Sequence, residues 1–439
     1  MLCRLDAKSQ DVIIDDLDFT TMPATQTAVI SSRNRIIPLH NALVNTGPWE
    51  FILTDNSRSY LNLKKTWLVT TFKITGADGQ PVPKTDTKLY APINNIAHSI
   101  VKNFTLNINS QLVYHNSTNY AYKSYFENLL MYSDEQKRST LSVSGFAPDA
   151  IIDNKDSSGY KTRAGWVSEG KKLQVAANIS IDLTNQPRVL LNNSHVKLTA
   201  YPNSEAFLID NYEDSGIKYK FEVEDVYCIV NEMELADGLA NEMEAALREH
   251  KLFQYPLISS QVRSFFIDAN RLDAPANTLF TSKMPRRIFL GLVSAEAYNG
   301  DYNKSPFNFK PHGVRDVHID YCGITQPGRP MNLDFSKGKC VEPYLMLQEA
   351  LGHTRNNTTC NSISFDQFKN KGFTIFGFEL CPSAQDTSLF DLVRPTNVSI
   401  RLNFNTPTPN GGLYCVVYAE FDQIVALDYQ RNPIVDTVV

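Results

Sequence analysis

The sequence contains little cysteine and no long hydrophobic run. Its seven cysteines in 439 residues are odd in number and form no Cys-x-x-Cys pair. A disulfide framework needs dense, paired cysteines and a zinc site needs closely spaced ligands, so we expect reduced thiols and an intracellular compartment. Residues 1–18 lack the apolar core of a signal peptide, and no stretch approaches the ~18 apolar residues of a membrane span. We therefore expect neither export through a signal peptide nor a transmembrane segment.

An excess of positive charge is also missing. Lys and Arg number 42 against 47 for Asp and Glu, which gives a net charge of −5. A protein that coats nucleic acid with a basic face usually has the opposite sign, so no direct nucleic-acid binding is expected. The hydrophobic share of 42% and the charged share of 20% are those of a globular protein. The length predicts roughly two to three domains.

Motifs for catalysis or metal binding are missing as well. The sequence has no His-Glu-x-x-His, Gly-x-Ser-x-Gly, P-loop or Gly-x-Gly-x-x-Gly motif. His312 and His318 are six apart and do not form a His-x-His pair, and Asp15, Asp16 and Asp18 lack the spaced ligands of a calcium loop. We predict no catalytic residue, no metal site and no cofactor. Three basic pairs are expected to be solvated strand ends: Lys64-Lys65, Lys171-Lys172 and Arg286-Arg287.

Short strands with a period of two dominate what is present. Between Leu173 and Leu183 apolar residues alternate with small or polar ones. The same alternation recurs in both halves of the chain, at residues 103–108, 196–200, 217–223, 398–404 and 413–421. One-sided alternation predicts antiparallel sheets with one face against a core. The Asn-Gly-Gly at 410–412 predicts a hairpin turn into the strand that begins at Leu413.

Helical periodicity is rare and short. It covers about residues 119–132 and 239–251, and a third helix is expected from Pro343 to Gly352. These helices interrupt strands and do not alternate with them, which favours a sandwich or barrel. A break in the strand pattern at residues 201–216 separates two strand-rich halves.

The strand content predicts an all-β fold of two tandem β-sandwiches with short helices inserted in loops. A single eight-stranded jelly roll would leave half of the chain unexplained, so we expect two. The expected division is an N-terminal arm at 1–40, jelly roll 1 at 41–208 and jelly roll 2 at 209–439. The arm is acidic and weakly patterned, so it is expected to become ordered only on assembly.

Several segments, in order from about residue 11 to 436, carry a family resemblance. They include Asp16-Leu-Asp-Phe19, Gly47-Pro-Trp-Glu-Phe-Ile52, Ala91-Pro-Ile-Asn-Asn-Ile-Ala-His-Ser-Ile100, Pro285-Arg-Arg-Ile-Phe-Leu-Gly-Leu292, Cys415-Val-Val-Tyr-Ala-Glu-Phe-Asp422 and Arg431-Asn-Pro-Ile-Val-Asp436. Together they resemble the double jelly-roll major capsid proteins of Polinton/Maverick elements and adintovirus-type viruses.

This resemblance implies a structural and non-enzymatic role. The protein would form hexon-like, pseudo-hexagonal homotrimers that tile an icosahedral shell around a double-stranded DNA genome. Its partners would be its own copies and neighbouring capsomers, a penton protein with a single jelly roll, and minor capsid proteins. It would be found in the virion capsid after assembly in the nucleus or cytoplasm of the host cell.

Three questions stay open from the sequence. The aromatic segments 298–309 and 373–378 are candidate trimer contacts, although core packing explains them equally well. The second reading is a capsid-derived protein that a host has domesticated. The sequence indicates the fold in both cases and does not distinguish a viral gene from a domesticated one. A jelly-roll module that binds a ligand is the third reading, and the missing signal peptide and sparse cysteines count against it.

Overall fold

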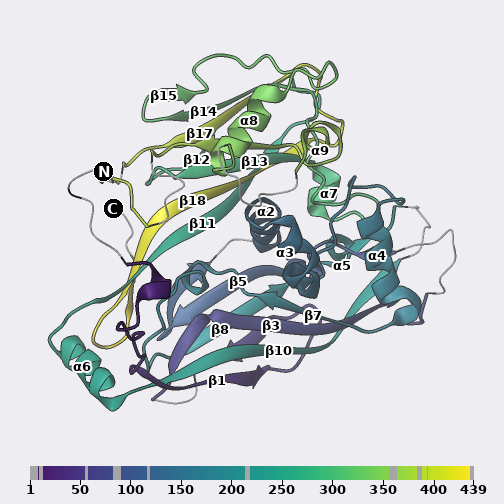
Figure 1. The fold of residues 1–439 in the computed structure, drawn as a ribbon. Coiled ribbons are helices and arrows are strands. Elements are labelled where there is room, and N and C mark those ends of the chain that lie inside the picture. Colours follow the sequence, from purple (N-terminus) through teal and green to yellow (C-terminus); the bar gives the residue numbers. More distant parts are fainter. Residues whose placement is uncertain are drawn as a thin grey trace.

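The computed structural model describes residues 8, 13–54, 58–82, 90–115, 119–212, 218–354, 363–382, 388–392 and 394–435. In this part of the chain nineteen strands form antiparallel sheets, and short helices lie in the connections (Figure 1). The all-β prediction is confirmed. No helix among these residues is long and apolar enough to cross a membrane.

The first sandwich consists of two four-stranded sheets. Its strands are β1 (Val29–Pro38), β2 (Trp49–Ile52), β3 (Tyr60–Gly76), β5 (Val101–Ile108), β6 (Gln111–His115), β7 (Leu173–Asn178), β8 (Val196–Pro202) and β10 (Tyr219–Leu235). The sheets have the orders β1-β10-β3-β7 and β2-β8-β5-β6. Their apolar faces share a buried cluster that includes Trp49, Phe72 and Phe104. A further pair, β4 (Ala91–Pro92) and β9 (Ile209–Asp210), lies outside these sheets.

The second sandwich is built in the same way. Its strands are β11 (Phe253–Ile267), β12 (Asp273–Phe280), β13 (Arg287–Ser294), β14 (Val314–Tyr321), β15 (Ile324–Gln326), β16 (Ile375–Glu379), β17 (Val398–Phe404), β18 (Leu413–Leu427) and β19 (Pro433–Val435). The sheets have the orders β11-β18-β13-β16 and β12-β17-β14-β15, and β19 adds to the end of β18.

The two sandwiches have the same topology. If the eight main strands of each are numbered along the chain, both sandwiches have sheets in the orders 1-8-3-6 and 2-7-4-5. This is the jelly-roll arrangement of antiparallel strands. Two tandem eight-stranded jelly rolls are therefore confirmed, although the two halves show no visible repeat in sequence.

The pairing of β10 bears on where the first jelly roll ends. β10 pairs with β1 on one side and with β3 on the other. The polar break at 201–216 lies between the seventh and eighth strands of one roll. A division placed there, between residues 208 and 209, separates β10 from the two strands with which it pairs. The expected arm at 1–40 likewise contains β1. That strand lies at a sheet edge and is mostly exposed, which explains its weak apolar pattern.

The helices occupy loops. They are α1 (Ile96–Ser99), α2 (Tyr120–Met131), α3 (Asp134–Arg138), α4 (Ser158–Val167), α5 (Glu205–Leu208), α6 (Asp237–Arg248), α7 (Ala295–Asn299), α8 (Val341–Ala350) and α9 (Phe365–Asn370). Short 3-10 turns are η1 (Asp15–Leu17), η2 (Thr140–Ser144), η3 (Ser168–Gly170) and η4 (Asp182–Thr184). The three predicted helices are confirmed as α2, α6 and α8.

Two local predictions are wrong. The alternation from Leu173 to Leu183 ends as a strand at Asn178, because the next apolar residues turn into η4. The Asn-Gly-Gly at 410–412 does not close a hairpin, because β17 and β18 belong to different sheets. It turns the chain from one sheet to the other, and Gly412 adopts a φ of 76° there.

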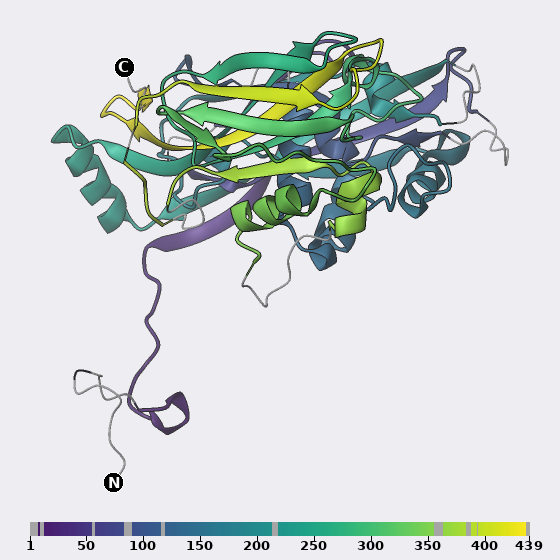
Figure 2. The ribbon, with the colours of Figure 1, turned by 90° about the horizontal axis from the view of Figure 1, so that it is seen from above.

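Two features of the arrangement matter for function. α2 lies at the junction of the two jelly rolls (Figure 1), and its residues from Tyr120 to Leu130 are buried on every side. Residues 13–28, which precede β1, extend away from the body of the molecule (Figure 2). In this described arm, residues 13–28, Phe19 is 87% exposed and Met22 is 84% exposed.

Candidate functional site

The junction of the two jelly rolls contains a buried ionic cluster centred on α2. Lys123 and Glu127 are one helical turn apart, so both side chains lie on the same face of the helix. Lys123 is completely buried, and its Nζ lies 3.4 Å from Oε1 of Glu127 and 3.3 Å from Oδ1 of Asp182 in η4. The same Nζ donates a hydrogen bond of 2.7 Å to the carbonyl oxygen of Ser180. The ammonium group is thus surrounded by acceptors, as a buried charge requires.

The cluster continues into the second jelly roll through β11. Ser259 donates from its Oγ to Oδ2 of Asp182 at 2.7 Å, and the Ser260 N–H donates to Oδ1 at 3.2 Å. The Ser260 hydroxyl also donates to Oε1 of Glu127 at 3.2 Å. Two carboxylates from the first roll are therefore bound by the first strand of the second roll.

A second contact crosses the junction through β18 and β13. The Tyr418 hydroxyl lies 3.0 Å from Oε1 of Glu420 and 3.4 Å from Oε1 of Glu127. Glu420 in turn binds the guanidinium of Arg287 through both carboxylate oxygens. The chain of contacts runs from Lys123 through Glu127, the Tyr418 hydroxyl and Glu420 to Arg287. Each carboxylate is paired with one cation, and the phenol between the two carboxylates joins the two rolls at this point.

The protonation states follow from this arrangement. Burial disfavours the charged form of Lys123, but Glu127 and Asp182 outweigh it and raise the pKa of the ammonium group above its usual value. Burial also raises the pKa of the Tyr418 hydroxyl far above its usual value. Both groups therefore keep their protons at every physiological pH, and they hold the surrounding carboxylates through an ammonium group and a neutral phenol.

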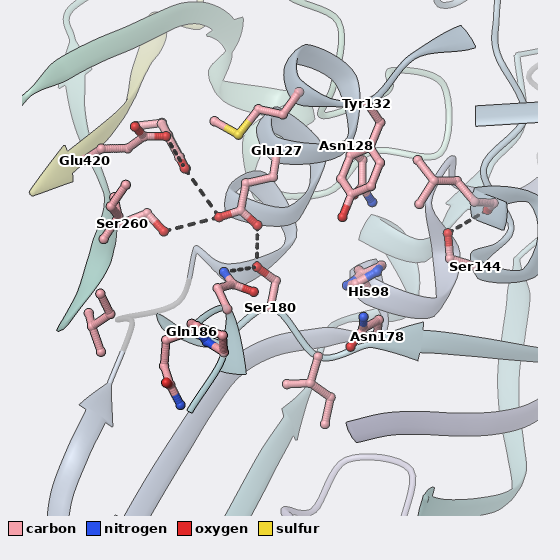
Figure 3. Close-up of a pocket in the computed structure, with 18 of the residues that line it drawn as sticks. His98, Glu127, Asn128, Tyr132, Ser144, Asn178, Ser180, Gln186, Ser260 and Glu420 are labelled. Atoms are coloured by element: carbon pink, nitrogen blue, oxygen red, sulfur yellow. Dashed lines mark hydrogen bonds between the residues drawn. The ribbon is translucent and has the colours of Figure 1, made fainter. Parts of the chain in front are cut away.

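A cleft of about 730 Å³ opens beside this cluster, between the two rolls. Its walls come from both halves of the chain. The first roll contributes His98, Asn128 and Asn178, and the second contributes Ile258 and Phe390. Figure 3 shows His98, Asn128 and Asn178 on one side of the cavity and the carboxylate cluster on the other.

His98 directs a hydrogen-bond donor into this cleft. The Ser180 N–H donates to the Tyr120 oxygen at 3.2 Å, which leaves the phenol hydrogen for Nδ1 of His98, 2.9 Å away. In this arrangement, with the phenol as donor to Nδ1, the imidazole proton is on Nε2, for which the described residues offer no acceptor. Burial, together with the charge of Lys123, lowers the pKa of His98 to about 3, so the ring is neutral. The side chain is only 4% exposed, yet it lines the cavity.

Residues considered as metal ligands do not come together. Among the residues described, no group of three or more His, Cys, Asp or Glu side chains is placed to hold a metal ion. His318 lies in β14, whereas His312 lies in the loop before it with a φ of 44°. The Asp18 carboxylate accepts the backbone N–H groups of Thr20 and Thr21, at 3.1 and 2.9 Å, and so closes a local turn.

One interpretation of a basic pair is wrong. Arg286 and Arg287 are not solvated. Arg286 is 1% exposed with its Nη1 2.7 Å from Oδ1 of Asp422, and Arg287 binds Glu420. Both arginines lie where β13 enters the buried sheet, next to carboxylates of β18 that the sequence pattern does not reveal. The other two basic pairs are exposed as predicted, although Lys64-Lys65 lies within β3 and not at a strand end.

Most aromatic rings of the segments 298–309 and 373–378 are buried. Phe307 stacks on Tyr125 of α2 across the junction of the two jelly rolls, with ring centroids 4.0 Å apart. Phe376 and Phe378 are 1% exposed, and Phe376 packs against Phe335 and Phe368 within the second roll. Tyr298 and Tyr302 are partly exposed, so these two rings stay candidate trimer contacts.

The sequence did not single out Lys123, Glu127 or Glu420, and it named Arg287 only as part of a solvated basic pair. The signal for the first two was present, because they interrupt a helix whose remaining residues are mostly aromatic or apolar. A lysine and a glutamate one turn apart are usually a solvated pair on an exposed helix face. Only the position of α2 between two sheets turns this pair into a buried one.

Comparison with solved structures defines the class of fold. The chain is similar to a chain of the Sputnik virophage (TM-score 0.68, 11% identity, 100% of this chain and 94% of the other). It is also similar to the mavirus major capsid protein (0.58, 11%, 100% and 97%) and to a chain of the PBCV-1 capsid (0.56, 9%, 96% and 100%). The protein therefore has the double jelly-roll fold found in viral major capsid proteins.

Comparison of sequences defines the family. No protein-family model matches the chain. An uncharacterized protein of Caenorhabditis elegans, F54H12.2, is 64% identical over 424 residues, which are 95% of this chain and 100% of that protein. The chain belongs to the family of this nematode protein.

Proposed function

We propose that this protein is the major capsid protein of a double-stranded DNA virus or virus-like element. The observation that carries the proposal is the extent of the structural similarity: the virophage chain matches all of this chain and 94% of its own length. Both jelly rolls and their mutual placement are thus accounted for by one architecture. The role is structural, and neither a catalytic residue nor a cofactor is required.

The capsomer we propose is a homotrimer. Two jelly rolls side by side in each chain give six in a trimer, and a pseudo-hexagonal outline tiles a closed shell through repeated contacts. We divide the chain between β10 and β11, which is supported by the pairing of β10 with β1 and β3. Five-fold vertices do not fit such a block, so we propose a penton protein with a single jelly roll and minor capsid proteins as partners.

The proposed context is a virion of the Polinton/Maverick and adintovirus type, assembled inside the host cell. The support for this lineage is the ordered set of sequence segments from about residue 11 to 436. The net charge of −5 supports a shell that does not itself condense DNA. We expect other proteins to neutralise the genome.

Mass photometry and electron microscopy of the purified chain test the proposal. The expected species is three times the 49.5 kDa chain, and raising the concentration should give closed shells or hexagonal sheets. A strictly monomeric protein at every concentration and salt would contradict the capsid role. Protein washed with a chelator should assemble as well as untreated protein. If the wash removes a stoichiometric metal ion and assembly is lost with it, the protein has a metal site and this part of the proposal is contradicted.

One observation favours a second candidate, a capsid-derived protein retained by a host. The relative that is 64% identical over its whole length is a nematode protein. The two candidates differ in what a shell encloses. Shells that protect double-stranded DNA of genome length from nuclease support the virion, whereas empty shells or trimers without shells in native tissue support domestication.

A further inference from the structure

Two strand edges border the cleft without a neighbouring strand in the described part of the chain. β7 is the outer strand of β1-β10-β3-β7, and β11 is the outer strand of β11-β18-β13-β16. Ala176 and Asn178 of β7 and Ile258 of β11 line the cleft between these edges. An unpaired edge presents backbone N–H and C=O groups to which an extended segment can add as a further strand.

The backbone groups of Ala176 and Asn178 point away from β3. The Ile179 N–H donates to the carbonyl of Thr66 at 3.1 Å, and residues that face the partner alternate with residues that face away in an antiparallel ladder. Ala176 and Asn178 fall on the outward positions. Within the described residues these outward groups have no hydrogen-bond partner, and Asn178 is exposed. β7 therefore offers unpaired backbone groups at this edge, on the side of the cleft that η2 also lines.

The opposite wall adds further donors and acceptors. The Ser260 N–H donates to Asp182 and so faces away from β18, which places Ile258, two residues earlier, on the outward side as well. Pro256 has no N–H, so pairing along this edge is interrupted and β7 is the better template. The Nε2–H of His98 points into the same space from a side chain that is 96% buried.

The arm has the complementary properties. Residues 19–28 (Phe-Thr-Thr-Met-Pro-Ala-Thr-Gln-Thr-Ala) carry no charge, have no helix and almost no strand, and begin with the exposed Phe19 and Met22. The cleft offers apolar side chains that are themselves partly exposed, namely Met131 at 39%, Tyr132 at 38% and Phe390 at 41%. Contact between the arm and the cleft would therefore cover exposed apolar side chains on both surfaces.

We propose that residues 19–28 of a second copy of this chain lie in the cleft as an added strand along the β7 edge. The inference rests on the proposed self-assembly and names the surface through which it occurs. A second copy is favoured over the same chain because the arm extends away from its own body (Figure 2). The acidic residues Asp16 and Asp18 lie outside the added segment.

Photo-crosslinking of the full-length protein tests this arrangement. Phe19→benzoylphenylalanine, in an equal mixture of heavy and light isotope-labelled chains, should crosslink mainly to η2 and β7, and half of those products should join heavy to light chains. Ile324→benzoylphenylalanine, 53% exposed on β15, is the matched control and should not label the cleft. Crosslinks to the cleft that never mix isotopes would mean that the arm folds back on its own chain, and would overturn the proposal.

Competition by a synthetic peptide of residues 19–28 tests the strand pairing itself. The peptide should suppress the crosslink, and N-methylation should abolish competition at every second residue, because only alternate N–H groups face β7. Pro23 has no N–H, so the sensitive positions are those of the opposite parity to Pro23. His98→Phe should weaken competition about tenfold, the usual effect of one lost hydrogen bond. Ala176→Pro should do the same while leaving the bonds with β3 intact, and its melting temperature checks that the fold is unchanged.

The outcomes separate this inference from the capsid role. If shells form but the peptide fails to compete, or competes without a period of two, the arm does not add to β7 and the capsid role stands. If the peptide competes with a period of two but no trimer or shell ever forms, the proposed function fails and the cleft remains a strand-binding site.

Discussion

Lys123 and Glu127 stand one turn apart on α2, with Nζ 3.4 Å from Oε1, at the point where the two jelly rolls meet. Lys123 has no exposed side-chain surface, so the cost of removing its charge from water must be offset by its carboxylate partners. Because those partners are bound in turn by Ser260 and Tyr418 of the second roll, the pair couples the stability of one roll to its contact with the other.

Glu127→Ala should destabilise the whole chain. The substitution leaves Lys123 buried with Asp182 as its remaining carboxylate, and removing one member of a buried ion pair costs about 3–5 kcal/mol. We expect a clear fall in the urea midpoint, followed by tryptophan fluorescence and circular dichroism.

The double variant Lys123→Met with Glu127→Leu is the control for that experiment. It removes both charges and fills the space with apolar atoms, so much of the lost stability should return. A single Glu127→Ala variant that unfolds at the same urea concentration as the wild type would show that the pair is not needed to hold the rolls together.

Phe307→Ala should also be costly, for a different reason. The Phe307 ring stacks on Tyr125 at 4.0 Å with 2° between the planes, and it is 1% exposed. Truncating a buried phenylalanine costs about 3–5 kcal/mol because a cavity remains. Phe266→Ala, at a site that is 48% exposed, should cost far less. Equal melting temperatures for the two variants would contradict this assignment.

Stability should depend on pH through Asp210. Burial raises the pKa of this carboxyl from its usual 3.8 to about 7, although Arg163 opposes the shift, and Asp149, Asp153 and Tyr212 also face it. Between about pH 4 and 7 the unfolded chain releases a proton that the folded chain keeps, so the free energy of unfolding falls as pH rises. The Asp210→Asn variant should lose most of that slope. Its stability relative to the wild type should therefore be higher at pH 8 than at pH 5.

The control for the pH experiment is an exposed aspartate on a strand edge, Asp273. Asp273→Asn should leave the slope of the wild type in place when melting temperature is measured from pH 4 to pH 8. If the Asp210→Asn variant also keeps the wild-type slope of stability against pH, groups other than Asp210 cause the pH dependence and the prediction is wrong.

The sequence predicted those strands and helices in which one face is buried, because the spacing of apolar residues within the segment then shows its type. Period-two alternation found β5, β8, β17 and β18, and period-3.6 spacing found α2 and α6. The helix α8 was found from Pro343 at its start and Gly352 after its end. β1 was missed because a mostly exposed edge strand carries little apolar pattern.

The junction could not be predicted in the same way. Which carboxylate meets Lys123 depends on where η4 crosses β11. Asp182 of η4 and Ser259 of β11, which are hydrogen-bonded there, are 77 residues apart in sequence. The unpaired β7 edge is equally invisible in sequence, because it results from strand order and not from residue type.

Deleting residues 1–28 should leave both jelly rolls folded and trimers intact, but it should impair shell assembly. The described arm, residues 13–28, makes its contacts mainly within itself, whereas the ladder with β10 begins at Val29. We expect an unchanged melting temperature and far fewer closed particles by electron microscopy and light scattering. Normal shells from the truncated chain would contradict a role for the arm in assembly.

Deletion through residue 38 is the matched comparison, because it also removes β1. Arg33 and Arg35 then no longer reach Glu232, whose carboxylate is only 3% exposed and lies 3.2 and 2.6 Å from the two guanidinium groups. A buried carboxylate left without its cations, together with the lost ladder on β10, should lower the melting temperature strongly. The contrast between the two deletions therefore places the end of the arm at β1: the first should affect assembly alone, and the second should affect folding. If both unfold the chain to the same extent, residues 13–28 belong to the fold of the first jelly roll and are not an arm.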